Sequence, residues 1–219
     1  MNEYSFKKRA GNMFLEPNGK EKTDKYHKIL DAAIKVFAEQ GFFRSTISQI
    51  AKEAGVADGT IYLYFKNKDD ILLQFYSDKT RKIFNKFREA VDKSENSGEK
   101  FRNLIRCHLR EFQRDRNMAV VYMAEARKGQ QLDSMLDELT KMYLDVVGEV
   151  VEQGQAEGRF RKDLYLSLVK RYILGGVEAV ISTWVYAGGK YDLESMADPL
   201  VDLFLRGIGS NGVAAGEIS

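Results

Sequence analysis

Hydroxyl and ammonium side chains gather in one short segment that could bind a phosphate backbone. The segment is GTIYLYFKNK, residues 59–68, in which hydroxyl-bearing residues are interleaved with apolar ones. Hydroxyl and ammonium groups donate hydrogen bonds to phosphate oxygens, while small or apolar side chains can approach base edges. The candidate DNA contacts are Gly59, Thr60, Tyr62, Leu63, Tyr64 and Lys68. The segment therefore predicts binding to double-stranded DNA, unless the tyrosines simply fill a core.

The helical period favours the first of those two interpretations. At about 100° per residue, Ile61 and Phe65 share one face, which we expect to be buried. Tyr62 and Tyr64 then lie on the flanks of the opposite face, at roughly 80° to either side of the buried one. We therefore expect both tyrosines at the surface. Lys66 could contact a DNA phosphate, but a solvated charge without a partner is an equally good interpretation of this residue.

A second candidate site is a stripe of arginines spaced four residues apart. Arg102, Arg106, Arg110 and Arg114 fall in a helix expected over about 98–115, where this spacing places them on one face. Guanidinium groups bind phosphates, and apolar residues nearby would suit a hydrocarbon chain. The candidate effector contacts are Arg106, His108, Arg110, Phe112, Met118, Tyr122, Met123 and Trp184. Each group has an alternative interpretation. The arginines could pair with glutamates, the methionines could belong to an ordinary core, and His108 could make a structural hydrogen bond.

The elements that must position the DNA contacts have the pattern of a helix-turn-helix over residues 46–65. A first helix is expected over about 24–40. Thr46 and Gln49 have the capping-box spacing that starts the next helix, and Gly55 allows the tight turn after it. Two short helices joined in this way form the motif. An ordinary corner between two helices is the alternative.

The segment TISQIAKEAGVADGTIYLYFKNKDDIL resembles the DNA-binding domain of the TetR family of bacterial transcriptional regulators, over about residues 24–75. The resemblance implies a homodimer with a three-helix N-terminal domain and a helical C-terminal domain that binds an effector. It also implies that Thr46 contacts a phosphate and that Gly59 lies against base edges. Asp58 departs from the family, in which a basic or small polar residue is common. We expect Asp58 to cap its helix or to accept a hydrogen bond from a cytosine amino group.

Two later segments are similar to the acyl-CoA-responsive repressors of fatty-acid degradation within this family. They are MAVVYMAEARKGQQL, residues 118–132, and STWVYAGGKYDL, residues 182–193. This resemblance implies a repressor that leaves an inverted-repeat operator when a long-chain acyl-CoA binds. One alternative is a sensor of drugs or aromatic compounds that controls an efflux pump. Another is a helical interaction protein that does not bind DNA.

The last two long helices, expected over about 164–186 and 193–208, combine small and apolar residues. Small residues let helices approach closely, so these helices are expected to form half of a four-helix dimer interface. The candidate interface residues are Leu168, Tyr172, Gly176, Val180, Leu200 and Phe204. Packing within one subunit is the alternative.

Composition predicts an all-α protein. The chain has 219 residues, 44% hydrophobic and 30% charged, with only two prolines. Residues 1–68 carry 12 Lys and Arg against 8 Asp and Glu, so the basic end is the N-terminal one. The expected parts are a flexible basic arm (1–22), the DNA-binding domain (23–70), an effector-binding and dimerisation domain (71–209) and a flexible tail (210–219).

No catalytic or metal-binding pattern is present in the sequence. The chain has two histidines and one cysteine, without HxxxH, CxxC or P-loop spacing. We therefore expect no enzyme activity, no metal and no cofactor. The single Cys107 fits a reducing compartment, and no signal peptide or membrane span is apparent. A cytoplasmic location without membrane contact is expected.

Overall fold

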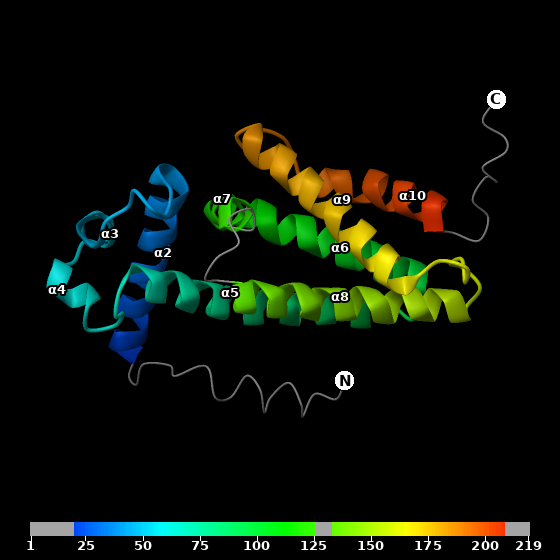
Figure 1. The fold of residues 1–219 in the computed structure, drawn as a ribbon, viewed down its shortest axis with the longest axis horizontal. Coiled ribbons are helices and arrows are strands. Elements are labelled where there is room, and N and C mark those ends of the chain that lie inside the picture. Colours follow the sequence, from blue (N-terminus) through cyan, green and yellow to red (C-terminus); the bar gives the residue numbers. More distant parts are fainter. Residues whose placement is uncertain (1–19, 126–132, 209–219) are drawn as a thin grey trace. The chain divides into compact units, whose positions relative to one another are not determined.

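A computed structural model describes residues 20–125 and 133–208, and every regular element within them is a helix, which confirms the all-α prediction (Figure 1). The elements are α2 (Lys20–Gln40), α3 (Ile47–Ala54), α4 (Asp58–Ile61), α5 (Lys68–Asp92), α6 (Ser97–Arg114), α7 (Arg116–Glu125), α8 (Asp133–Ala156), α9 (Leu166–Tyr186), the 3₁₀ turn η1 (Glu194–Met196) and α10 (Ala197–Ile208). The predicted tail (210–219) lies outside the described residues, as does the predicted arm (1–22) except for residues 20–22, which begin α2.

The chain divides into two compact units, one ending at Lys79 and the other beginning at Thr80. The boundary therefore falls inside α5, nine residues after the predicted limit at 70. Helix α5 extends from Lys68 to Asp92. The sequence around Asp92 has no strong signal for a helix end, so the length of this helix was not predictable.

The first unit is built from α2, α3, α4 and the start of α5. The apolar side of α2 packs on α3, and Ile29 and Ile50 are fully buried. Tyr26 of α2 stacks on Phe65, with ring centroids 5.0 Å apart. Asn67 caps α5, because its side-chain oxygen accepts a hydrogen bond from the Asp70 amide at 2.8 Å.

The second unit is organised around α6, which packs against α7, α8, α9, η1 and α10. Its aromatic core includes Phe101 of α6, whose ring lies 5.8 Å from that of Phe204 on α10 and 6.2 Å from that of Phe160. Burial of each such side chain contributes about 1.5–3 kcal/mol to folding. Figure 1 shows α9 and α10 side by side, and these two helices are in contact.

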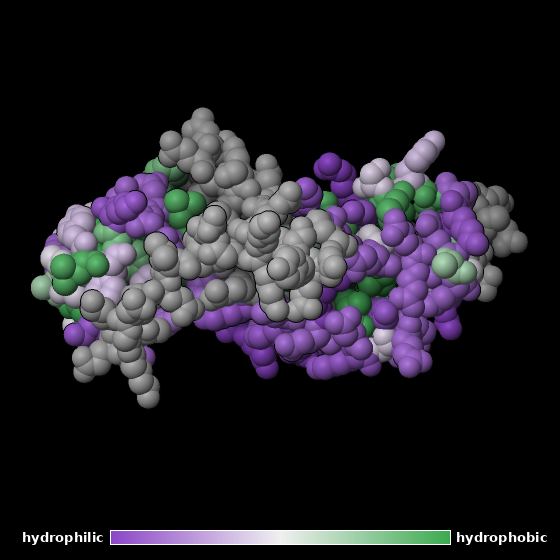
Figure 2. All heavy atoms as spheres, turned by 90° about the horizontal axis from the view of Figure 1, so that it is seen from below, coloured by the Kyte–Doolittle hydropathy of each residue, from purple (hydrophilic) through white to green (hydrophobic). Residues whose placement is uncertain are grey.

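Hydropathy is drawn for one face of the molecule in Figure 2. The face drawn in Figure 2 is largely hydrophilic, with only scattered hydrophobic side chains. Within residues 20–125 and 133–208, no helix combines the length and the apolar character needed to cross a membrane.

Candidate functional site

The helix-turn-helix begins with the capping box that its sequence predicts. The Thr46 hydroxyl accepts a hydrogen bond from the Gln49 amide at 3.2 Å. In return, the Gln49 side-chain oxygen accepts one from the Thr46 amide at 2.8 Å. Gly55 then ends α3 with a φ of +63°, the left-handed conformation that glycine adopts without strain. Thr46 itself is exposed at the start of α3.

The α4 segment, residues 58–65, exposes the side chains predicted to face outward. The helix proper ends at Ile61, earlier than the predicted Phe65, although Phe65 still donates its amide to the Ile61 carbonyl at 3.0 Å. Both of these residues are buried, whereas Tyr62 is 59% and Leu63 81% exposed. Gly59 is also exposed, and a Cβ placed there would meet no atom within 4 Å.

This burial pattern confirms the prediction that the tyrosines do not fill the core. Thr60 and Tyr64 are both half-buried, on the flanks of the exposed face. The DNA contacts themselves stay a prediction.

Asp58 does not cap its helix, so that part of the prediction is wrong. Asp58 is the first residue inside α4, and Ala57 occupies the N-cap without a side-chain hydrogen bond. The Asp58 carboxylate instead accepts a hydrogen bond from the Ser48 hydroxyl on α3. The pair links the two helices of the motif. A contact between Asp58 and a cytosine stays a prediction.

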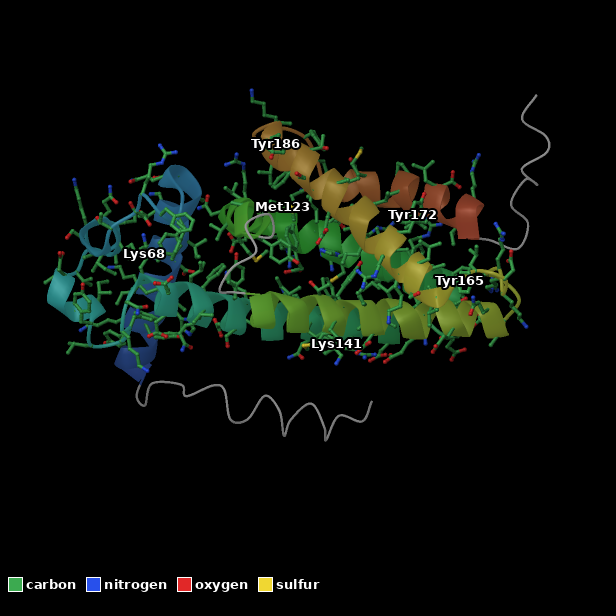
Figure 3. All side chains as sticks on the ribbon, in the orientation of Figure 1. Lys68, Met123, Lys141, Tyr165, Tyr172 and Tyr186 are labelled. Carbon is green, nitrogen blue, oxygen red and sulfur yellow. The ribbon has the colours of Figure 1, made fainter. Side chains whose placement is uncertain are left out.

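Lys68 has a structural role, and the phosphate contact predicted for it stays a prediction. Its ammonium donates hydrogen bonds to the carbonyls of Phe42 at 2.6 Å, Ser45 at 2.9 Å and Phe43 at 3.3 Å. An ammonium has three hydrogens, so these bonds occupy all of them. The nitrogen also lies 4.6 Å from the centre of the Phe42 ring. Lys68 thus joins the start of α5 to the loop after α2, where Figure 3 labels it.

Five aromatic rings from four helices form a cluster in the second unit, here called the ring cluster. Its members are Phe87 of α5, His108 and Phe112 of α6, Tyr122 of α7 and Tyr143 of α8. His108 is at its centre, with ring centroids 4.8 Å from Tyr143 and 5.1 Å from both Phe87 and Phe112. The structure therefore brings three predicted effector residues together: His108, Phe112 and Tyr122.

Phe87 and Tyr143 are members of the ring cluster that the sequence analysis missed. Tyr143 directly follows Met142 in a stretch of apolar residues, and its helical face is not evident without the position of α8. Its side chain is buried, whereas Met142 is only half-buried.

Two polar atoms in the ring cluster are buried without a hydrogen-bond partner among the described residues, Nδ1 of His108 and the hydroxyl of Tyr143. Burial lowers the pKa of His108 to about 3, so its imidazole is neutral at neutral pH. Burial also raises the pKa of Tyr122 to about 12 and the pKa of Tyr143 still further, and the negative charge of Glu178 on α9 adds to both shifts. The polar groups of the cluster rings are therefore neutral.

The arginine stripe is paired with acids, as its alternative interpretation predicts. Arg102 and Arg106 both bind Asp198 of α10, each at 2.7 Å. Hydrogen bonds from these guanidinium groups lower the pKa of Asp198, and the bond from Arg102 has the larger effect. Arg110 lies 3.8 Å from Glu194.

The stripe and the ring cluster lie on different sides of α6. Arg106 and His108 are two residues apart, which places them about 200° apart around the helix axis. The structure thus does not bring Arg106 and Arg110 together with the cluster. Their phosphate contacts stay predictions.

Trp184 is a structural residue, so its predicted place at the effector is not supported by the geometry. It is 2% exposed, and its indole nitrogen donates to the Tyr191 carbonyl at 2.8 Å. A Cβ added at Gly189 would come within 3.2 Å of the indole and 2.8 Å of the Arg116 side chain. Trp184 therefore holds the turn after α9. Met118 and Met123 are both buried, which fits a wall of the site or an ordinary core.

The predicted dimer interface divides into buried and exposed residues. Gly176, Leu200 and Phe204 pack within the subunit, and a Cβ on Gly176 would come within 2.7 Å of the Phe204 ring. Their predicted contacts with a second copy stay predictions. Leu168 is 61% and Tyr172 56% exposed, while Val180 is half-buried.

Further apolar and small residues extend the exposed part of this face. The resulting set, here called the α9–α10 stripe, is Leu168, Tyr172, Gly175, Ala179, Tyr186 and Leu203. In Figure 3, Tyr172 and Tyr186 lie well apart along α9. The α9 members recur at helical spacing, so they share one face.

Across the described ranges, no group of three or more histidine, cysteine or acidic side chains is placed to hold a metal ion.

Comparison with known proteins also matches the chain in two parts. Residues 29–75 match the model for bacterial regulatory proteins of the tetR family, and residues 76–207 match the model described as YsiA-like protein, C-terminal region. A "Fatty acid metabolism regulator protein" of Bacillus subtilis (strain 168) is 36% identical over 190 residues, which cover 86% of this chain and 98% of that protein.

Solved structures agree with these matches. The transcriptional regulator FadR from Bacillus subtilis, in complex with stearoyl-CoA, aligns with a TM-score of 0.77 and 34% identity over 86% of this chain and all of that one (100%). The ketosteroid transcriptional regulator KstR2 of Mycobacterium tuberculosis aligns with a TM-score of 0.73 and 25% identity over 89% of this chain and 97% of that one.

Proposed function

The chain belongs to the tetR family of bacterial regulatory proteins, and we propose that it is a repressor that a long-chain acyl-CoA releases from its operator. The observation that carries the DNA half of this proposal is the exposed face of the α4 segment. Tyr62 and Leu63 are exposed there while Ile61 and Phe65 anchor the segment from below. An exposed leucine and tyrosine on one short segment are costly in water, and they suit a groove lined by methyl groups and phosphates.

The proposed active species is a homodimer that reads an inverted repeat. The α9–α10 stripe offers an apolar surface for a second copy, and its small residues, Gly175 and Ala179, allow close approach of the helices. Two α4 segments related by a twofold axis would enter successive major grooves about 34–36 Å apart.

The proposed effector is a long-chain acyl-CoA, bound by the second unit. Support comes from the similarity to a fatty acid metabolism regulator and to a FadR structure in complex with stearoyl-CoA. The ring cluster supplies an aromatic surface that suits a hydrocarbon chain. A hundredfold release from DNA requires about 2.7 kcal/mol of preference for the conformation that does not bind DNA. The protein acts in the cytoplasm by binding alone, with no reaction and no cofactor.

Fluorescence anisotropy with DNA from upstream of its own gene tests the proposal. The purified protein is bound to this DNA and titrated with stearoyl-CoA, free stearate, coenzyme A or a panel of cationic dyes. Release by stearoyl-CoA alone is the expected result. Release by the dyes alone would favour an efflux regulator, and failure to bind the DNA would contradict the assignment of the α4 segment.

A scrambled DNA of the same length controls for nonspecific binding. Native mass spectrometry of the freshly purified protein adds an independent readout, because a retained ligand would identify the effector class by mass. The same spectrum reports whether the protein is dimeric.

A further inference from the structure

His108 and Tyr143 are an unusual pair of polar residues for an aromatic interior. Each side chain is 6% exposed, and their ring centroids are 4.8 Å apart. Around them lie Phe87 and Phe112, both in ring contact with His108. Nδ1 of His108 and the hydroxyl of Tyr143 have no hydrogen-bond partner in the described part of the chain.

Such unpaired atoms are expensive in a folded protein. A buried donor or acceptor without a partner costs about 1–3 kcal/mol, whereas phenylalanine or leucine at the same positions would carry no such cost. Buried polar groups are nearly always satisfied in native proteins. Two of them in one aromatic cluster therefore point to a partner outside the described part of the chain, such as a ligand.

The surroundings of the pair select an uncharged partner. Both groups are neutral, since burial keeps the imidazole unprotonated and the phenol intact. A carboxylate would meet aromatic walls and the nearby charge of Glu178. Two cations near the cluster phenylalanines in sequence, Lys86 and Arg114, both pair with the buried Glu111.

We propose that His108 and Tyr143 form a polar subsite that binds an uncharged oxygen atom of the effector within the ring cluster. This inference rests on the proposed function, since it assigns a role within the same effector site. A phenol can donate to a carbonyl oxygen and can also accept from a hydroxyl, and neutral imidazole nitrogens offer either possibility. The oxygen can therefore be the thioester carbonyl, or a hydroxyl or keto group farther along the acyl chain.

The Tyr143→Phe variant tests the subsite because it removes only the unpaired hydroxyl. Palmitoyl-CoA, 3-hydroxypalmitoyl-CoA and 3-oxopalmitoyl-CoA are titrated into the protein–DNA complex, with free palmitate as a fourth ligand. The loss of one neutral hydrogen bond is expected to weaken the response about 2- to 10-fold. A loss with all three thioesters would identify the thioester carbonyl as the oxygen bound. A loss confined to the 3-substituted chains would identify the chain oxygen.

The Tm of the ligand-free protein separates the two roles. A structural role for these polar atoms predicts a lower Tm in the variants, whereas a ligand-binding role does not. Because the Tyr143 hydroxyl has no hydrogen-bond partner among the residues that the structure describes, Tyr143→Phe should leave Tm unchanged or raise it. His108→Leu, which is similar in size, should behave alike in both measurements. Tyr165→Phe is the matched control, since its ring is 81% exposed and lies outside the cluster.

The outcomes separate this inference from the proposed function. If palmitoyl-CoA releases the DNA and neither variant changes any thioester response, the subsite is refuted while the repressor proposal stands. A lower Tm with unchanged ligand responses would also refute it, because the polar atoms would then serve the fold. If no thioester releases DNA from the wild-type protein, the proposed function fails and this inference with it.

Discussion

The α4 segment of the first unit and the ring cluster of the second unit treat their polar groups in opposite ways. Around the α4 segment, Asp58 is bonded to Ser48 and Lys68 to three carbonyls, so the scaffold is satisfied within the chain. In the ring cluster, His108 and Tyr143 each keep a buried atom unpaired. A surface that binds a rigid duplex benefits when the polar groups that support it are hydrogen-bonded within the protein. A site for a small molecule can instead leave polar groups that form hydrogen bonds with the ligand.

The largest expected effect is on stability, from a substitution of Lys68, whose hydrogen bonds support the α4 segment. Lys68→Ala should lower the free energy of unfolding by about 2–3 kcal/mol, since it removes the charged donor shared by three carbonyls. Urea unfolding followed by circular dichroism measures this loss. Lys66→Ala is the matched control, because Lys66 is exposed, and should change stability by less than about 0.5 kcal/mol.

The opposite result for Lys68→Ala would favour the predicted contact of Lys68 with DNA over a structural role. In that case Lys68→Ala would keep full stability, and the salt dependence of DNA binding would weaken by about one unit of slope. The comparison between the two regions would then fail at its first element.

The pH dependence of stability tests the other side of the comparison at His108. Its pKa falls from 6.5 in the unfolded chain to about 3 in the folded protein, so the folded state excludes a proton that the unfolded state binds. The stabilising contribution is complete above pH 6.5 and is lost as the pH falls toward 3. From pH 7 to pH 5 the expected loss is about 2 kcal/mol.

Urea unfolding at pH 7, 6 and 5 measures this slope. His108→Leu should flatten this slope. Equal slopes for wild type and variant would show that His108 is not buried in its neutral form.

Two neighbouring glycines of α9 sharpen the contrast between interior and surface. Gly176→Ala should cost about 1–3 kcal/mol, because its Cβ would overlap the Phe204 ring. Gly175→Ala, in open space, should raise subunit stability by about 0.5–1 kcal/mol through helix propensity. Equal effects from the two substitutions in thermal unfolding would contradict the assignment of Gly176 to the interior.

The α9–α10 stripe should respond to a buried charge. Leu203→Glu is expected to weaken dimer formation about tenfold or more, because a carboxylate would be desolvated in an apolar interface. Analytical ultracentrifugation over a range of concentrations measures the dissociation constant. Lys162→Glu, an exposed charge change outside the stripe, should have no such effect.

The smallest expected effect concerns one hydroxyl of the α4 segment. Tyr64→Phe should weaken DNA binding about 2- to 5-fold, equally on all sequences, because phosphate contacts carry no base information. Anisotropy titrations on operator and scrambled DNA measure this. Tyr165→Phe should bind like wild type, and an unchanged affinity for Tyr64→Phe would remove that residue from the interface.

Local signals allowed most of the first unit to be predicted. Thr46 and Gln49 form their capping box through residues three apart, and Ile61 and Phe65 are buried by the helical period alone. Lys68 shows the limit of such signals. Its carbonyl partners lie more than twenty residues earlier, and no spacing rule connects them.

The second unit was harder to predict because its faces depend on which helices meet. Gly175 and Gly176 are adjacent in sequence, yet only the second lies against Phe204. Tyr143 was missed, and the structural bond of Trp184 was not foreseen, for the same reason. The rings that Tyr143 contacts belong to α5 and α6, and the carbonyl that Trp184 binds belongs to the turn after α9.

The open space at Gly59 bears on how the operator of such a protein can change over evolution. The bond between Asp58 and Ser48, together with buried Ile61 and Phe65, holds the segment without using Gly59 or Leu63. A Cβ added at Gly59 would meet no atom of the protein within 4 Å, so in the proposed complex a substitution there would mainly change the contact with the bases. Recognition of a new operator is thus open to single substitutions that leave the fold intact.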